Sequence, residues 1–221
     1  MFDNISGRYD ALNRILSMGI DIRWRNRVMR EVARQAPNNL LDVATGTGDL
    51  VLALAKVVPG PLIGLDLSPG MLERGKQKVQ RSPFHERIEM MVGDSENLPF
   101  ETERFDAVSV AFGVRNFENL EAGLAEMQRV TRPGGMVYVL EFSKPKNRLF
   151  SKVYLSYFKH ILPRLGKLIS GDASAYTYLP ESVQAFPDGD AFLACLHEAG
   201  YKDGRSIPLT GGIATLYVAK K

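Results

Sequence analysis

The stretch that most constrains the fold is residues 40–50, LLDVATGTGDL. An apolar run ends on an acid, two glycines follow with one residue between them, and a helical pattern then begins. This order predicts a buried strand, a tight turn and a helix N-terminus, the arrangement by which an α/β sheet holds a nucleotide. Gly46 and Gly48 let a ligand approach the backbone, because no Cβ intervenes.

Two further positions narrow the ligand to an adenosine compound without a pyrophosphate. A dinucleotide fingerprint has a third glycine three residues after Gly48, where this chain has Val51, which argues against NAD. Asp66 ends a second apolar run, where an acid accepts hydrogen bonds from ribose hydroxyls. S-adenosylmethionine fits both observations, with Asp42 serving its ammonium group and the loop amides its carboxylate.

A third acid follows the next predicted strand. Asp94 and Ser95 come after residues 88–92, so they fall at the sheet edge where doubly wound folds bind ligands. A lone Gly-Asp at a strand end is more often only a turn. As the third acid on one edge, Asp94 is expected to accept a hydrogen bond from the adenine amine. The predicted cofactor contacts are Asp42, Gly46, Thr47, Gly48, Asp66, Asp94 and Ser95.

From residue 40 onward, strands and helices alternate, which is typical of a parallel sheet with crossover helices. Strands are predicted from residue 40 and at 62–66, 88–92, 105–112, 136–142, 207–210 and 213–219. Helices are predicted at 9–18, 22–33, 49–58, 68–79, 120–130 and 190–199. The expected fold is α/β and Rossmann-like, with a mostly parallel seven-stranded sheet and an antiparallel strand near the C-terminus. This is the class I S-adenosylmethionine-dependent methyltransferase fold.

The length of 221 residues suits one domain. We expect N-terminal helices over residues 1–37, a cofactor-binding core over 38–147, a lid or substrate segment over 148–182, and a C-terminal helix and hairpin over 183–221. Residues 148–170 combine apolar residues at a spacing of four with basic and aromatic residues. Such a segment suits a lid over the sheet or a contact with an anionic membrane.

Composition excludes several classes of protein. A net charge of +3 is too small for a nucleic-acid-binding surface that covers the molecule. Cys195 is the one cysteine, so no disulfide forms within the chain; it is expected to be a small buried residue in a cytoplasmic protein. His85, His160 and His197 lack the spacing of metal ligands, and no metal is expected. No signal peptide or membrane span is predicted.

Several separate blocks resemble the C-methyltransferases of menaquinone and ubiquinone biosynthesis over nearly the whole chain. Near the N-terminus the matching residues are Tyr9-Asp10, Asn13, Ser17 and Trp24. Further blocks are residues 112–116 (FGVRN), 129–135 (RVTRPGG), 141–143 (EFS), 176–182 (YTYLPES), 186–187 (FP) and 209–212 (LTGG). The chain departs from the family pattern at Leu12, Asp21 and Ala111, where the family usually has methionine, histidine and serine.

The resemblance implies methyl transfer from S-adenosylmethionine to a ring carbon of a polyprenylated quinol. That carbon becomes nucleophilic when the quinol loses a phenolic proton, and a free phenol has a pKa of about 10. Arg115 is the candidate for stabilising the phenolate and Asn116 for orienting the other hydroxyl. Arg115 paired with a neighbouring acid to hold the loop is an equal alternative. The proton acceptor is left open among Asp10, Asp21, His160 and a water on Tyr9.

Several alternatives stay open. The substrate is expected to be demethylmenaquinol, with the methoxy-benzoquinol of ubiquinone biosynthesis or another small molecule as the alternative. A catalytically silent cofactor-binding partner is a further alternative. A bilayer-dwelling substrate implies a cytoplasmic protein that transiently contacts the inner face of the cell membrane. No nucleic acid is expected as a partner, and a homodimer is one of the oligomeric states that the sequence leaves open.

Overall fold

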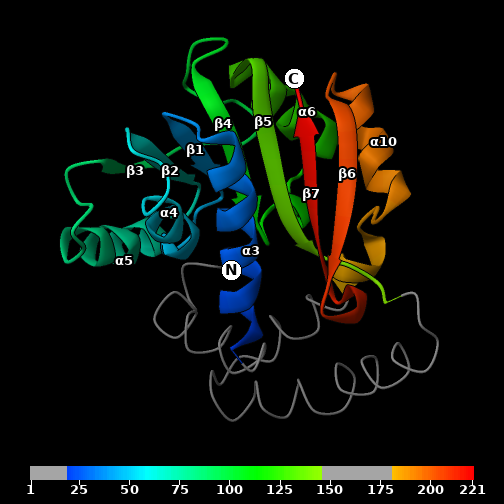
Figure 1. Ribbon diagram of the computed structural model, residues 1–221, viewed down its shortest axis with the longest axis horizontal. Coiled ribbons are helices and arrows are strands. Elements are labelled where there is room, and N and C mark those ends of the chain that lie inside the picture. The colour runs from blue at the N-terminus through cyan, green and yellow to red at the C-terminus, as the bar shows by residue number, and fades with distance from the viewer. Residues whose placement is uncertain (1–18, 146–180) are drawn as a thin grey trace.

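The computed structural model describes residues 19–145 and 181–221, which form a seven-stranded sheet with helices on both faces (Figure 1). The strands are β1 (Leu40–Val43), β2 (Leu62–Asp66), β3 (Ile88–Val92), β4 (Phe105–Ala111), β5 (Thr131–Phe142), β6 (Lys202–Leu209) and β7 (Ala214–Lys220). The helices are α3 (Ile20–Gln35), α4 (Asp49–Leu54), α5 (Pro69–Gln80), α6 (Leu120–Val130) and α10 (Asp190–Glu198). Short 3₁₀ turns are η1 (Val114–Asn116) and η3 (Thr210–Gly212).

The strand order is β3-β2-β1-β4-β5-β7-β6. β1 to β5 are parallel, and β7 pairs antiparallel with both β5 and β6. The predicted mostly parallel sheet with an antiparallel strand near the C-terminus is therefore confirmed. The order reverses between β1 and β4, and ligands of such sheets bind beyond the carboxyl ends of the strands at that point.

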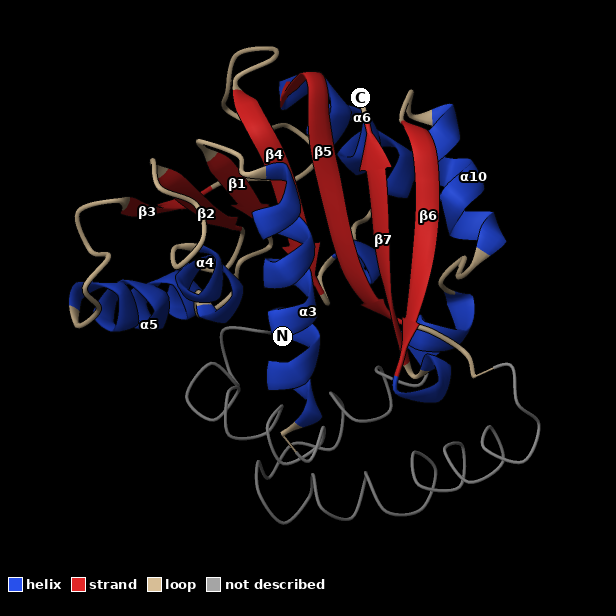
Figure 2. Ribbon diagram, in the orientation of Figure 1, coloured by secondary structure: helices blue, strands red, loops and turns tan. Residues whose placement is uncertain are grey.

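Two hydrophobic layers lie on opposite faces of the sheet. α3, α4 and α5 cover one face, through buried residues such as Trp24, Leu54 and Leu72. α6 and α10 cover the other, through residues such as Met127 and Phe192 (Figure 2). The central strand β1 contributes Leu40 to the first layer and Leu41 to the second, as the alternation of side chains in a strand requires. Cys195, predicted to be buried, is only partly buried at the edge of the second layer.

Three element boundaries differ from prediction by four or five residues, and the other described boundaries by at most two. α4 ends at Leu54 rather than residue 58. The guanidinium of Arg87 caps this end by donating to the carbonyls of Ala55 (2.8 Å) and Pro59 (3.0 Å). β5 begins at Thr131 because residues 132–135, predicted as a turn, form a bulge between two pairs with β4. β6 begins at Lys202, since an edge strand can expose polar side chains while its backbone pairs with β7.

The predicted helix at residues 9–18 and most of the lid or substrate segment lie outside the described residues. Over the two ranges that are described, no helix has the length and apolar character needed to span a bilayer.

Candidate cofactor and substrate site

The predicted site residues that the structure describes lie along one edge of the sheet. Asp42, Asp66 and Asp94 lie at or just past the carboxyl ends of β1, β2 and β3, three adjacent parallel strands. Arg115 and Asn116 lie in η1, which follows β4 on the other side of β1. The parallel pairing therefore brings the predicted cofactor and substrate residues to the same edge.

The glycine loop turns sharply and is tied to β2. Gly46 and Gly48 have φ of 57° and 80°, a region in which side chains are strained. The amide of Gly46 donates to Asp66 Oδ2 (2.7 Å). A Cβ built on Gly46 would meet no atom of the described residues within 4 Å, so these residues leave one side of this backbone open for a ligand. This geometry fits S-adenosylmethionine bound across the loop.

Asp42 is buried rather than displayed to solvent. Its side chain accepts hydrogen bonds from Thr45 Oγ1 (2.7 Å) and Ser109 Oγ (2.6 Å), and the residue is 1% exposed. Burial raises the pKa of Asp42 to about 7, although the two hydroxyls oppose the shift. A direct contact between Asp42 and a ligand ammonium stays a prediction. In the structure, the Asp42 carboxylate also orients the Thr45 side chain of the glycine loop.

Asp66 is fixed in place by two backbone amides, from Gly46 and from Ser68 (2.9 Å to Oδ1). Leu67 follows it with 70% of its surface exposed, although it is a large apolar residue. An exposed leucine beside the predicted ribose contact is a surface on which an adenosine can pack. Leu67 is not among the residues predicted for the site, and the one sign of it in the sequence is an apolar residue directly after Asp66.

Asp94 begins the loop between β3 and β4. Its side chain is exposed, and its Oδ1 accepts a hydrogen bond from the amide of Glu96 (2.9 Å). Asp94 also forms a bridge with Asn97, so the loop turns back immediately. Ser95 is partly exposed in this turn.

The glycine loop rests on groups that the sequence analysis missed. The side chain of Met90 fills the space beside three glycines, because a Cβ at Gly48, Gly64 or Gly75 would lie 3.3, 2.8 or 2.4 Å from its terminal atoms. From α5, Lys78 Nζ donates to Thr47 Oγ1 (2.9 Å) and Asp49 Oδ1 (2.8 Å). No spacing rule links these residues, which lie far apart in the sequence.

Arg115 forms a buried ion pair with Glu141. Its Nη1 lies 2.8 Å from Glu141 Oε1, and the two side chains are 8% and 0% exposed. The structure therefore shows the paired arrangement that was the alternative for this residue. Burial raises the pKa of Glu141, against the opposing effects of Arg115 and the amide of Phe142. Among the described residues, Arg115 Nε is the buried side-chain nitrogen without a hydrogen-bond partner.

Aromatic side chains surround this pair. Phe112 adopts a φ of 58°, a rare conformation for a bulky residue and one that clusters at functional sites. Its ring lies 4.7 Å from that of Phe142 and 5.8 Å from that of Trp24, measured between centroids. The Arg115 guanidinium lies 5.4 Å from the centre of the Phe142 ring. Phe112 and Phe142 are partly exposed and Trp24 is buried beneath them at 4% exposure, so two partly exposed rings lie beside a cation.

The proton-acceptor candidates fall into two groups. Asp10, His160 and Tyr9 lie outside the described residues. Asp21 is buried in the first turn of α3 and pairs with Arg25, which also lies 3.2 Å from Asp49 Oδ2. In the described part of the chain, no group of three or more His, Cys, Asp or Glu side chains has an arrangement that would hold a metal ion.

Solved structures of low sequence identity share this fold. A putative S-adenosyl-L-methionine-dependent methyltransferase from Methanococcus maripaludis is similar with a TM-score of 0.68 and 19% identity, over 100% of this chain and 94% of that chain. A SAM-dependent methyltransferase from Aquifex aeolicus is similar with a TM-score of 0.64 and 19% identity, over 89% and 88% of the two chains.

Curated relatives are more similar in sequence. The ubiquinone/menaquinone biosynthesis C-methyltransferase UbiE of Geotalea uraniireducens is 45% identical, over 100% of this chain and 94% of that protein. The demethylmenaquinone methyltransferase of Bacteroides fragilis is 43% identical, over 100% and 91%. The model of the ubiE/COQ5 methyltransferase family matches residues 1–221. The chain therefore belongs to the ubiE/COQ5 methyltransferase family.

Proposed function

We propose that this protein transfers a methyl group from S-adenosylmethionine to a ring carbon of a polyprenylated quinol, converting demethylmenaquinol to menaquinol. The observation that carries the proposal is the similarity over the full chain to relatives with this activity in their names, at 43% identity for the Bacteroides fragilis protein. The edge of the sheet described above supplies residues of the right chemistry for both the cofactor and the quinol.

When bound, S-adenosylmethionine supplies a methyl group on a sulfonium, which is already a strong electrophile. The chain then has to align the two reactants and exclude water. The loop of residues 46–48 would lie against the carboxylate, although in this structure the amides of Gly46 and Gly48 donate to Asp66 Oδ2 and to the Thr45 carbonyl, and Asp42 would favour the ammonium. Asp66 would accept from the ribose hydroxyls, while Asp94, with Ser95 beside it, would accept from the adenine amine.

The quinol has to lose a phenolic proton before its ring carbon can attack. Near neutral pH this requires a cation beside the oxygen or a nearby base to accept the proton, because the pKa of a free phenol is about 10. Arg115 is the proposed cation, and its buried Nε has no hydrogen-bond partner among the described residues. Asn116 would orient the second hydroxyl, and the partly exposed rings of Phe112 and Phe142, backed by Trp24, would pack against the quinol. Glu141 would keep the guanidinium in place.

The isoprenoid tail of the substrate resides in the bilayer. We therefore infer a cytoplasmic protein that contacts the inner face of the cell membrane transiently. The basic and aromatic residues of 148–170 support this contact. The same residues are equally suited to the alternative, a lid over the sheet.

The test is methyl transfer by the purified protein in detergent. Labelled S-adenosylmethionine is supplied with a reduced prenylated demethylnaphthoquinol and, separately, with the prenylated methoxy-benzoquinol. Product from the naphthoquinol supports the proposal. Product from the benzoquinol as well would add the second candidate, which the ubiquinone/menaquinone names of several relatives favour. Tight cofactor binding with no product from either quinol would contradict the proposal.

A further inference from the structure

The loop between β3 and β4, residues 93–104, is anchored to helix α6. Asp94 and Ser95 lie near the start of this loop, and Leu98 and Phe100 further along it are buried at 3% and 8% exposure. These two side chains pack in the same hydrophobic layer as Leu124 and Met127 of α6. Hydrophobic contact is non-directional, so it does not by itself fix where the backbone of such a loop lies.

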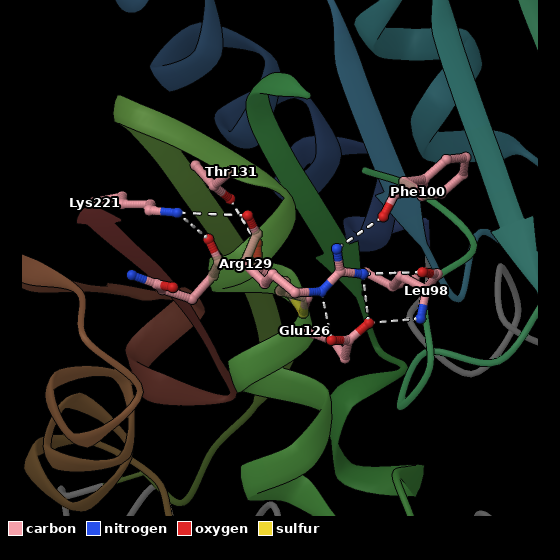
Figure 3. A network of polar contacts seen from close by, with 8 residues as sticks. Leu98, Phe100, Glu126, Arg129, Thr131 and Lys221 are labelled. Carbon is pink, nitrogen blue, oxygen red and sulfur yellow. Dashed lines mark hydrogen bonds and ion pairs between the residues drawn. The ribbon is translucent and has the colours of Figure 1, made fainter. Parts of the chain in front are cut away.

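A charged pair on α6 fixes the backbone of the loop (Figure 3). Arg129 donates from Nε to Glu126 Oε1 (2.7 Å) and from Nη2 to Glu126 Oε2 (2.8 Å). The same guanidinium donates from Nη1 to the carbonyl of Phe100 (2.8 Å) and from Nη2 to the carbonyl of Leu98 (3.0 Å). Glu126 Oε2 accepts in turn from the amide of Leu98 (2.8 Å). The pair therefore holds both backbone polar groups of Leu98.

The N-terminus of α6 makes a second tie to the loop. The amide of Asn119 donates to Glu96 Oε1 (2.9 Å), and the amide of Glu96 donates to Asp94 Oδ1 (2.9 Å). Asp94 therefore precedes two anchors in the loop, the Glu96 side chain two residues later and the Leu98 backbone four residues later. Both anchors are held by the same helix.

The contacts of Glu126 favour its charged form, which pairs with Arg129. The hydrogen bond from Arg129 lowers the pKa of Glu126, desolvation opposes it, and the Leu98 amide adds to the lowering. The arginine is needed for its shape as well as its charge. A planar guanidinium can donate to a carboxylate and to two carbonyls at once, whereas the compact ammonium of lysine cannot reproduce that fork.

We propose that Arg129 and Glu126 are positioning residues for the adenine end of the cofactor. They hold Leu98 and Phe100, and through them the turn that presents Asp94 and Ser95. This inference rests on the proposed contact between Asp94 and the adenine amine, and it adds residues that do not touch the ligand. α6 thus contributes to cofactor recognition, although it packs on the face of the sheet.

The test measures selectivity for the adenine amine. S-adenosylhomocysteine and its inosine counterpart, in which a carbonyl replaces the amine, are titrated calorimetrically against the full-length protein. A hydrogen bond to a charged group is worth about 1.5 kcal/mol or more, so the wild type should prefer the adenine ligand by about tenfold or more. Arg129→Ala should weaken binding of the adenine ligand and leave binding of the inosine ligand nearly unchanged. The ratio of the two affinities should then be close to one.

Arg132→Ala is the matched control. Arg132 lies three residues after Arg129, at the start of β5, and pairs with Asp106 (2.7 Å) at the start of β4, the end away from the ligand edge. This variant should retain the wild-type preference. Arg129→Lys and Glu126→Gln, which disturb the fold less, should reduce the preference in part and serve if Arg129→Ala does not fold.

Two outcomes would overturn the inference, and they are distinguishable. If the wild type prefers the adenine ligand and the Arg129 and Glu126 variants keep that preference, the pair only stabilises the fold. If the wild type itself shows no preference, the contact between Asp94 and the adenine amine is wrong, and the proposed placement of the cofactor fails with it.

Discussion

Asp42 and Glu141 are carboxylates with almost no exposed surface, at 1% and 0%, near the ligand edge of the sheet. Burying an ionisable group costs stability unless it is paired and hydrogen-bonded. Asp42 accepts hydrogen bonds from the hydroxyls of Thr45 and Ser109. Glu141 accepts from the guanidinium of Arg115 and from the amide of Phe142. Strongly perturbed acids in this position are typical of functional sites.

Asp42 should make stability depend on pH in a specific direction. Because its folded-state pKa of about 7 lies above its ordinary value, the folded chain holds this proton more tightly than the unfolded chain. The contribution is fully present below about pH 4 and is lost as the pH rises to about 7, by at most about 1.4 kcal/mol per pH unit.

Urea unfolding of the wild type and Asp42→Asn at several pH values measures this. The variant should gain in stability relative to the wild type as the pH rises, because it has no proton to lose. Asp94→Asn is the control, since the Asp94 side chain is exposed. A constant difference between wild type and Asp42→Asn across the range would contradict the assignment.

Arg115→Lys should lower kcat for methyl transfer by about a hundredfold, the usual cost of losing one oxyanion donor. The KM for S-adenosylmethionine should stay within about twofold, because Arg115 is assigned to the quinol and not to the cofactor. Arg104→Lys is the matched control, since Arg104 also lies over aromatic rings, 5.0 Å from the centre of Phe100, but outside the site. Equal losses in both variants would show that Arg115 has only a structural role.

Among the elements, α4 depends on a side chain from outside it. Arg87 precedes β3 and donates to carbonyls at and just past the C-cap of α4, including those of Ala55 and Val58. Without Arg87, those carbonyls lose a charged donor in a part-buried setting. Since the glycine loop leads directly into α4, the end of this helix influences the cofactor site.

Arg87→Ala should lower the free energy of unfolding by about 1.5 to 3 kcal/mol, the range for hydrogen bonds to charged groups. Thermal and urea unfolding measure this change. Arg81→Ala, an exposed residue at the end of α5, should change it by less than about 0.5 kcal/mol. Equal stability of the Arg87 and Arg81 variants would mean that water caps α4 equally well.

The element-level predictions succeeded where local pattern decides the structure. Ser68 caps α5 by accepting from the amide of Met71, as its place before a proline predicts. α4 and β6 were misjudged because their limits depend on distant partners, Arg87 and β7. In the same way the site acids followed from strand ends, whereas Glu141, Met90 and Lys78 join the site only through tertiary contacts.

At the scale of the whole molecule, α3 joins the two ends of the described chain. Trp24 Nε1 donates to Thr210 Oγ1 (2.8 Å), and Arg205 of β6 lies 2.7 Å from the buried Glu31. Burial would raise the pKa of Glu31, but Arg205, Arg27 and Arg34 together lower it below its ordinary value. Glu31 therefore stabilises the fold above its unfolded-state pKa, and this contribution is lost as the pH falls through its folded-state pKa.

Glu31→Gln should cost about 1 to 3 kcal/mol near neutral pH, reduced by the solvent exposure of its arginine partners. This corresponds to a fall in Tm of about 2 to 4 °C per kcal/mol. Glu89→Gln, on an exposed position of β3, is the control and should leave Tm nearly unchanged. Loss of stability that persists undiminished in acid would contradict the ionic origin.

Methyl transfer to a ring carbon of the quinol is tested most directly by locating the transferred methyl group in the product. The protein is incubated with S-adenosylmethionine carrying a trideuterated methyl group and with reduced prenylated demethylnaphthoquinol, and the product is analysed by NMR and mass spectrometry. We predict the label on the ring carbon beside a hydroxyl, and almost no labelled product with Arg115→Lys under the same conditions. A label on oxygen, or no transfer despite bound cofactor, would contradict it.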